Sequence, residues 1–309
     1  LLIDMKIYSK LFLLTFFILT IRAEENLNFF DPMDVFELEW ASDPQVSPDG
    51  KKIVYVRKSN DIMKDRVRSS LWQIDITGKN HRPINSGLKN SYSPRWSPDK
   101  QKLAFVSNIS GSTQIHMHWL KSGETAVISQ LQESPSSLSW SPDGKWLAFT
   151  MNVKAESESI AEEREKPDGA SWAKKPITVT TTQYQYDGRG IVEPSYRHIF
   201  IVPSEGGSAR QLTEGNFNHY GSLSWSPESQ NIFFSAHRSN NWELVSDEAD
   251  IYKLNIASRT LKQITNQSGE ESSPMISPNG KMIAFNLKER RPLAYTPKRI
   301  AVMNVNGKN

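Results

Sequence analysis

The sequence predicts an all-β protein, a β-propeller made of four-stranded blades, and a repeated phrase is the main reason. A turn built on Ser-Pro recurs five times among 309 residues, and each copy leads through a polar spacer into an apolar strand. The prolines are 50, 44, 85 and 51 residues apart. Three of these steps match the roughly 40–50 residues of one blade. The copies are Val46-Ser47-Pro48-Asp49-Gly50, Trp96-Ser97-Pro98-Asp99-Lys100, Trp140-Ser141-Pro142-Asp143-Gly144, Trp225-Ser226-Pro227-Glu228-Ser229 and Ile276-Ser277-Pro278-Asn279-Gly280.

The repeated phrase has the chemistry of a tight turn between two strands. Proline fixes φ at the first central position, Asp or Asn suits the next, and Gly accepts a positive φ. A hydrophobic residue before the turn and an apolar run after it predict a β-hairpin. The apolar runs are residues 53–56, 103–106, 147–150, 232–235 and 283–286.

Two further strands complete each unit. They are expected at 114–120 and 125–128 in the second unit, and at 250–254 and 261–265 in the fourth. Four short strands followed by the next Ser-Pro turn make one blade. The tryptophans of the phrase, Trp96, Trp140 and Trp225, repeat in register and are therefore expected in the core. The chain also has 37% hydrophobic residues, enough for a large core.

The N-terminus reads as a targeting segment, with Met5 as the start of translation. Lys6 and Lys10 provide a basic region, residues 11–21 are apolar, and Ala23 is a small residue suited to precede cleavage. We therefore expect residues 1–23 to be upstream residues plus a signal peptide, and the protein to be exported, either periplasmic or secreted. A buried strand and an uncleaved anchor are the alternatives. The only membrane contact expected is through this segment.

Charge and cysteine content exclude several function classes. Removing residues 1–23 leaves 34 basic against 33 acidic residues, so no basic stripe for nucleic acid is expected. The chain has no cysteine and hence neither disulfides nor thiol chemistry. His116 and His118 share one face of a strand, a spacing that zinc can use, but no third ligand is evident. No metal and no cofactor are expected.

The 85-residue step predicts an insertion inside the third blade rather than an additional blade. We expect residues 152–196 between the second and third strands of that blade, with 198–202 as the third strand. The insertion begins with a charged, helix-compatible stretch. Long insertions in compact domains are functional or disordered, and a solvated surface excursion is the alternative.

A polar and aromatic cluster in the insertion could reach the charged end of a peptide, with Glu193 pairing with a free α-amino group. Hydrogen bonds that stabilise the loop are the simpler interpretation. The cluster is Tyr186, Asp187, Arg189, Glu193 and Tyr196.

These motifs carry a family resemblance that covers roughly residues 30–309. Residues 40–50 and the Ser-Pro-Asp-Gly-Lys turn at 139–150 resemble the propeller of the prolyl oligopeptidase family of serine peptidases, specifically its acylaminoacyl-peptidase and dipeptidyl-peptidase-like branch. The segments 196–203 and 206–213 match in kind. The Ser-Pro-Asp-Gly repeat alone is also shared by TolB-like and WD-like propellers, whereas residues 40–50 and the interrupted third blade are more specific.

The resemblance implies a two-domain enzyme in which a C-terminal α/β-hydrolase domain carries the catalytic Ser, Asp and His. We expect that domain to be absent from this chain, which contains no Gly-x-Ser-x-Gly nucleophile motif. The nearest segments, 169–173 and 206–210, fail the pattern. No catalytic residue is therefore assigned, and the chain alone is expected to be inactive.

Two functions from different classes follow. The first is the N-terminal, substrate-gating propeller of an exported serine peptidase that cleaves short peptides, or acylated or dipeptidyl N-termini. The second is a non-enzymatic periplasmic TolB-like propeller that mediates protein–protein interaction. We expect residues 24–43 to lead into a partial propeller of about five blades at 44–309. The fifth unit ends before its fourth strand, which predicts truncation before closure, and the family resemblance implies seven or eight blades.

Overall fold

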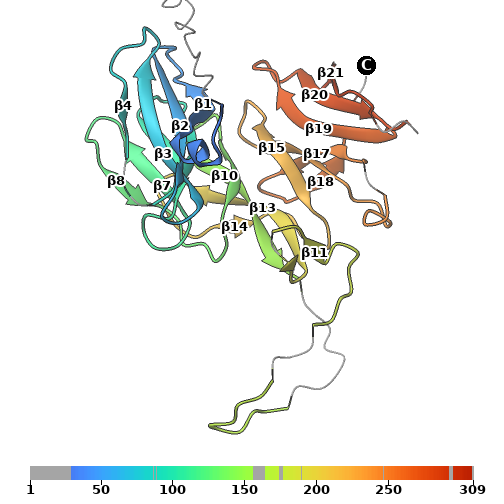
Figure 1. Ribbon diagram of the computed structural model, residues 1–309. Coiled ribbons are helices and arrows are strands. Elements are labelled where there is room, and N and C mark those ends of the chain that lie inside the picture. The colour runs from blue at the N-terminus through green and yellow to red at the C-terminus, as the bar shows by residue number, and fades with distance from the viewer. Residues whose placement is uncertain are drawn as a thin grey trace, which may run out of the picture. The chain divides into compact units, whose positions relative to one another are not determined.

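The computed structural model describes residues 29–85, 87, 89–155, 164–173, 177–188, 190–245, 247–291 and 295–307 (Figure 1). The chain divides into two units, residues 1–38 and residues 39–309. The described part of the first unit holds a short 3-10 helix, η1 (Pro32–Glu37). Its N-cap is Asp31, whose carboxylate accepts a hydrogen bond from the Met33 N–H at 2.8 Å.

The second unit consists of successive antiparallel sheets, which confirms the predicted propeller fold. Four sheets have four strands, and within the described residues the fifth has three. The blades are β1 (Glu39–Val46), β2 (Lys52–Asp61), β3 (Arg66–Asp75) and β4 (Arg82–Pro83); β5 (Ser91–Trp96), β6 (Lys102–Ser107), β7 (Gln114–Trp119) and β8 (Thr125–Val127); β9 (Ser136–Trp140), β10 (Trp146–Lys154), β13 (Ser195–Pro203) and β14 (Arg210–Gln211); β15 (His219–Trp225), β16 (Asn231–Ala236), β17 (Asp250–Asn255) and β18 (Leu261–Gln263); and β19 (Gly269–Ile276), β20 (Met282–Glu289) and β21 (Arg299–Asn304).

The first blade begins at Glu39, ahead of the boundary expected at residue 44. Residues that read as a lead-in are part of the first strand, because Trp40 pairs with Lys58 and Ser42 pairs with Val56. The strand accommodates Pro44 because the pairing register shifts between Ser42 and Gln45.

The Ser-Pro turns explain why serine and a short polar residue recur together. In the first turn the Ser47 hydroxyl donates to the Asp49 carboxylate at 2.6 Å and accepts from the Lys52 N–H at 2.9 Å. The backbone carbonyl of Ser47 also accepts from the Gly50 N–H at 2.8 Å. The same serine-to-carboxylate bond closes the turns at Asp99 and Asp143. In the first turn this bond is the main reason that the pKa of Asp49 lies below its usual range.

A left-handed residue interrupts the first strand of every blade, a feature that the sequence analysis did not anticipate. The pairing register shifts at this place in the sheets of all five described blades, which marks a β-bulge. The residues are Asp43 (φ 48°), Ser93 (φ 53°), Ser137 (φ 53°), Gly221 (φ 78°) and Ser273 (φ 55°).

Tryptophans of the repeated phrase tie blades 2, 3 and 4 each to the blade before it. The indole N–H of Trp96 donates to the carbonyl of Gln45 at 3.0 Å, and that of Trp140 donates to Arg95 at 3.0 Å. The indole of Trp225 donates in the same way to the third blade, at 3.4 Å from the carbonyl oxygen of Ser139. These tryptophans pack against the core as expected, and they also bind the blades together through polar contacts.

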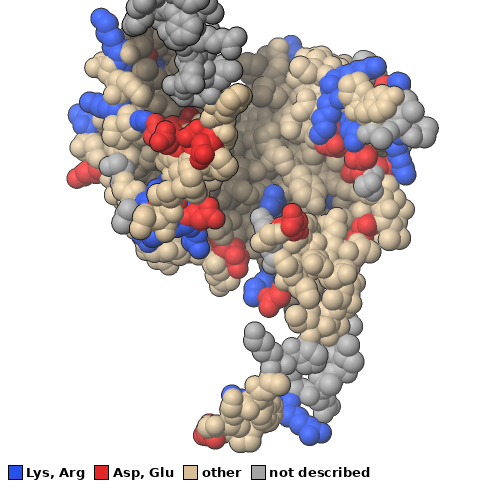
Figure 2. Space-filling model, viewed as in Figure 1, with Lys and Arg blue, Asp and Glu red and all other residues tan. Residues whose placement is uncertain are grey.

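The hydrophobic core lies between consecutive blades. Each of four clusters joins side chains from two neighbouring sheets, and each contains a buried phenylalanine. Phe105, Phe149, Phe234 and Phe233 mark the junctions of blades 1 and 2, 2 and 3, 3 and 4, and 4 and 5. On the face shown in Figure 2, Lys and Arg are interspersed with Asp and Glu over the blades.

The substitution Trp140→Phe should lower the free energy of unfolding by about 1–2 kcal/mol, because it removes one hydrogen bond and leaves the Arg95 carbonyl without its donor. Urea denaturation followed by circular dichroism measures the loss. Trp146→Phe is the matched control, since no hydrogen bond of its indole is found among the described residues. An equal loss in the two variants would show that only ring size matters.

Candidate functional site

The insertion leaves the third blade between its second and third strands. β10 and β13 pair without interruption from Trp146 with Pro203 to Lys154 with Ser195, so the segment between them covers residues 155–194. The expected range was 152–196. Its described part contains a small hairpin, β11 (Gln185–Tyr186) paired with β12 (Gly190–Ile191). The middle of the stretch expected to favour a helix, 156–163, lies outside the described residues.

A small pocket of about 60 Å³ lies where the insertion meets the loop that follows β16. We call it the insertion pocket. It brings together three of the five residues predicted from sequence, Tyr186, Glu193 and Tyr196. Asp187 is exposed in the turn after β11 and does not line the pocket. Arg189 lies outside the described residues.

The three predicted residues differ in their surroundings. Tyr196 is 8% exposed, and its ring meets that of Trp242 edge-on, with centroids 6.1 Å apart. Burial is the main reason that the pKa of Tyr196 lies above its ordinary value. Tyr186 is half exposed, and its hydroxyl donates to the side-chain oxygen of Gln183 at 2.9 Å. Tyr196 therefore forms a fixed aromatic wall of the pocket, whereas the ring of Tyr186 is open to solvent.

Glu193, the residue predicted to pair with a free amine, already contacts an amine of this chain. Lys154 Nζ lies 2.6 Å from Glu193 Oε2, and both side chains are largely exposed. The hydrogen bond from Lys154 is the main cause of the lowered pKa of Glu193. Because the pair is exposed, its contribution to stability is small and an incoming ammonium group can compete with Lys154.

Residues of the fourth blade complete the pocket, and the sequence analysis missed them. The Glu243 carboxylate accepts from the Thr182 backbone N–H at 3.2 Å and from the Thr182 hydroxyl at 3.3 Å. Trp242 and Glu243 lie in the connection between β16 and β17, which is long for a hairpin of this protein. The sequence signal that could have identified them is an aromatic residue followed directly by an acidic one, Trp242-Glu243, in a long polar segment between two strands. The pocket thus presents two carboxylates, Glu193 and Glu243, beside three aromatic rings.

A second pocket, of about 590 Å³, is lined by the first strands of blades 1 to 4 and is called the axial pocket. Its lining includes Arg95, whose guanidinium lies 2.8 Å from the carboxylate of Asp43. The Ser137 hydroxyl donates to the Gly221 carbonyl at 2.8 Å across the same surface. Two of the left-handed residues, Ser137 and Gly221, therefore line this pocket directly.

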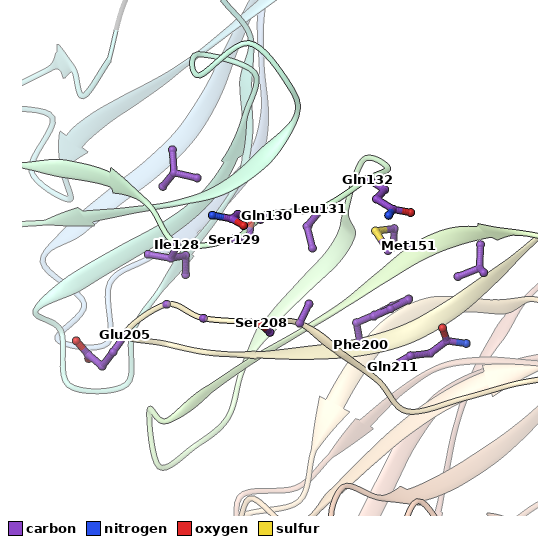
Figure 3. Close-up of a pocket in the computed structure, with 15 residues that line it drawn as sticks. Ile128, Ser129, Gln130, Leu131, Gln132, Met151, Phe200, Glu205, Ser208 and Gln211 are labelled. Carbon is purple, nitrogen blue, oxygen red and sulfur yellow. The ribbon is translucent and has the colours of Figure 1, made fainter.

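A third, outer groove of about 770 Å³ runs between blades 2 and 3 (Figure 3). The segment from Ile128 to Gln132 forms one side, and the β13–β14 hairpin with Glu205 and Ser208 forms the other. Phe200 adds an aromatic surface. Among the described residues that line the groove, the charged side chain is that of Glu205.

The histidine pair does not form a metal site in the part of the chain that the structure describes. There, no group of three or more His, Cys, Asp or Glu side chains is arranged to hold an ion. His116 is buried, stacks on Phe105 with centroids 5.4 Å apart, and has its pKa lowered by that burial. His118 instead contacts the Thr125 hydroxyl at 2.9 Å. No helix among the described residues is long and apolar enough to cross a membrane.

Comparison with known proteins identifies the family to which this fold corresponds and two relatives of similar sequence. Residues 50–309 match the TolB beta propeller domain. The chain is 31% identical over 222 residues to the Bacillus subtilis protein named "Uncharacterized peptidase YuxL", covering 71% of this chain and 33% of that protein. It is 26% identical over 283 residues to Dipeptidyl-peptidase 5 of Porphyromonas gingivalis, covering 87% of this chain and 40% of that protein. The chain thus spans well under half the length of these relatives.

A solved structure is similar in fold. The crystal structure of TolB from Acinetobacter baumannii matches with a TM-score of 0.51 and 16% identity, over 93% of this chain and 74% of that one. The chain is therefore related both to peptidase propellers and to TolB. The resemblance to the propellers of prolyl oligopeptidase family peptidases is confirmed.

The substitution Glu243→Ala should free the insertion from blade 4, because it removes both side-chain hydrogen bonds to Thr182. Limited proteolysis should then cleave within residues 177–188 several-fold faster than in the unaltered protein. Glu214→Ala, which removes an exposed ion pair with Arg259 elsewhere on the surface, is the control. Unchanged cleavage in Glu243→Ala would show that Thr182 and Glu243 do not hold the insertion.

Proposed function

The chain belongs to the TolB beta propeller domain family, and from this premise we propose that it is the substrate-gating propeller of an exported serine peptidase. The substrates are short peptides, cleaved next to a dipeptidyl or an acylated N-terminal residue. The propeller restricts access to the active site by size and holds the N-terminal side of the substrate. Hydrolysis itself is assigned to a C-terminal α/β-hydrolase domain of the same polypeptide.

The observation that carries this proposal is the insertion pocket. Two carboxylates, Glu193 and Glu243, line one small cavity with Tyr186, Tyr196 and Trp242. A peptide with a free N-terminus presents an ammonium group followed by a side chain, and such a group is recognised by charge-assisted hydrogen bonds to carboxylates. Aromatic rings add surface for the neighbouring side chain and favour a cation near their faces. The names of the two peptidase relatives support the same reading.

The chemical roles divide between binding and exclusion. Lys154 neutralises Glu193 while the pocket is empty, and the ammonium group of a substrate replaces it on binding. The hydrogen bond of Thr182 to Glu243 and the contact of Tyr196 with Trp242 hold the pocket in one conformation. Binding a peptide therefore costs little conformational entropy of the pocket. A propeller that covers an active site admits only flexible chains of modest length.

The second candidate is a non-enzymatic TolB-like propeller that binds other proteins. It is favoured by the matched domain and by the extent of the fold similarity to TolB. The two candidates differ in whether a peptidase domain acts together with this propeller, and in whether the insertion pocket binds peptide N-termini.

In the full-length polypeptide that contains this chain, Glu193→Gln and Glu243→Gln should each raise KM by about tenfold for peptides with a free N-terminus, because each removes a charge-assisted hydrogen bond. For peptides with a blocked N-terminus KM should not change, and kcat should stay the same for both. Steady-state kinetics with matched free and blocked chromogenic peptides measures the ratio. Glu214→Gln is the control. An unchanged preference rejects the amine-binding role and leaves the peptidase assignment to be tested separately.

A serine-reactive phosphonate probe tests the peptidase assignment itself. The full-length polypeptide should be labelled, because acyl transfer needs an activated serine, whereas the isolated chain should not be labelled. Absence of labelling in the full-length polypeptide would favour the TolB-like alternative. Labelling of the isolated chain would place the nucleophile inside the propeller and contradict the division of roles.

A further inference from the structure

Two acidic side chains lie at the junction of blades 4 and 5, Glu271 buried and Asp250 partly buried. Glu271 in β19 is only 1% exposed, and neither of its carboxyl oxygens has a hydrogen-bond partner among the described residues. Asp250 begins β17, and one of its oxygens is likewise buried without a partner. Its other oxygen accepts from the Gln263 side chain at 3.0 Å. An unpaired buried carboxylate is costly, so this pair needs a physical explanation.

The pair lies where the backbones of the two blades are directly joined. The Ala249 N–H donates to the Gly269 carbonyl at 3.1 Å, and the Glu271 N–H donates to the Ala249 carbonyl at 2.8 Å. Ala249 and Glu270 form a parallel bridge between the sheets. Gly269 has φ 127°, and a Cβ there would collide with the Lys288 carbonyl of the adjoining strand, so within blade 5 only glycine fits at this end of β19. Any repulsion between the two carboxyls acts on this contact between the blades.

The equivalent position is occupied differently in other blades. Glu271 stands two residues before the left-handed Ser273, as Ser91 and His219 stand before their own left-handed residues. The Ser91 hydroxyl donates to that of Ser107 at 2.9 Å, and the His219 ring contacts the Arg197 carbonyl at 2.7 Å. Those two buried groups are neutral and hydrogen-bonded. The blade 4–5 junction instead has an acid at this place.

Neighbouring charges do not neutralise the pair. Glu248, next in the chain to Ala249, adds a further negative charge and pairs with Arg290 at 2.8 Å. The lysines around the junction are paired elsewhere, Lys288 with Asp247 and Lys298 with Glu270. The remaining titratable groups around it are Tyr252, whose pKa is raised by burial and by Asp250, Arg238, which faces Tyr252, and His237, which faces Glu248.

We propose that Asp250 and Glu271 form a proton-dependent switch that holds blade 4 against blade 5 while the pair retains a proton and loosens this junction when both side chains ionise. The retained proton supplies a further donor beside the Thr265 hydroxyl, since a protonated carboxyl can itself donate a hydrogen bond. The proposal rests on the buried geometry and does not depend on the proposed enzymatic function.

The direction of the pH effect follows from the raised pKa values. Burial, with a smaller contribution from Glu248, raises the pKa of Asp250 from 3.8 to about 6, and burial and Asp250 raise the pKa of Glu271. The Thr265 hydroxyl opposes part of both shifts. Because the folded state keeps a proton that the unfolded state loses, stability decreases as the pH rises from about 4 to about 6, and the loss is complete above the folded pKa. The raised pKa of Glu271 acts in the same direction, because its ionisation also disfavours the folded state.

Hydrogen exchange followed by mass spectrometry of the purified protein tests the switch. After correction for intrinsic rates, exchange in 249–252 and 269–273 should increase roughly tenfold from about pH 5 to about pH 8, while exchange in β6 should not change. Glu271→Gln and Asp250→Asn should each abolish the increase. Glu270→Gln, the neighbouring acid whose side chain pairs with Lys298, is the matched control and should retain it.

Each result decides the proposal. No increase in the unaltered protein overturns it, and this measurement holds even if one variant fails to fold. An increase that persists in Glu271→Gln also overturns it, because a structural role alone would change exchange at both pH values without removing the dependence on pH. Loss of the increase in both variants, with the Glu270→Gln response intact, supports the switch.

Discussion

The left-handed residue in the first strand of each blade is the constraint on which the packing of the blades depends. In the first three blades the carbonyl that accepts the next blade's indole N–H lies two residues after it, at Gln45, Arg95 and Ser139. A bulge removes one residue from the regular ladder and leaves backbone groups to find other partners. The tryptophan of the following Ser-Pro phrase provides that partner. Turn, bulge and tryptophan are thus three parts of one blade-to-blade contact.

The junction of blades 4 and 5 departs from this scheme in two ways. The fourth blade has one additional residue between Gly221 and its Ser-Pro turn, and the fifth has Ile276 where blades 2, 3 and 4 have tryptophan. The Ile276 N–H donates to the Ser224 hydroxyl at 3.0 Å in place of an indole. At the same junction the buried Glu271 stands where the second and fourth blades have the neutral Ser91 and His219. One junction of the propeller is therefore held differently from the rest.

Much of the fold could be predicted from the sequence, because turns and strands are local features. The Ser-Pro phrase is typical of a hairpin turn, and the missing turn after Pro142 indicated a long connection there. The bulges could not be predicted, since Ser93, Ser137 and Ser273 are ordinary residues that adopt positive φ only under the pairing of the finished sheet. The start of the first blade at Glu39 could not be predicted either, because residues 39–42 become a strand only through their pairing with β2.

The candidate site was only partly accessible to sequence reasoning. Tyr186, Glu193 and Tyr196 were identifiable because they lie close together in the chain and are chemically suited to a peptide terminus. Their partners were not, because Lys154 reaches Glu193 through the register of β10 with β13, and Trp242 comes from another blade. Such non-local contacts depend on tertiary packing.

Whether this propeller works with a peptidase domain is tested by the coding sequence downstream of Asn309. We expect an open reading frame that continues into an α/β-hydrolase domain with a Gly-x-Ser-x-Gly motif, placed between a strand and a helix and followed by Asp and then His. A reading frame that closes the propeller and then stops would contradict this expectation and favour a TolB-like binding protein.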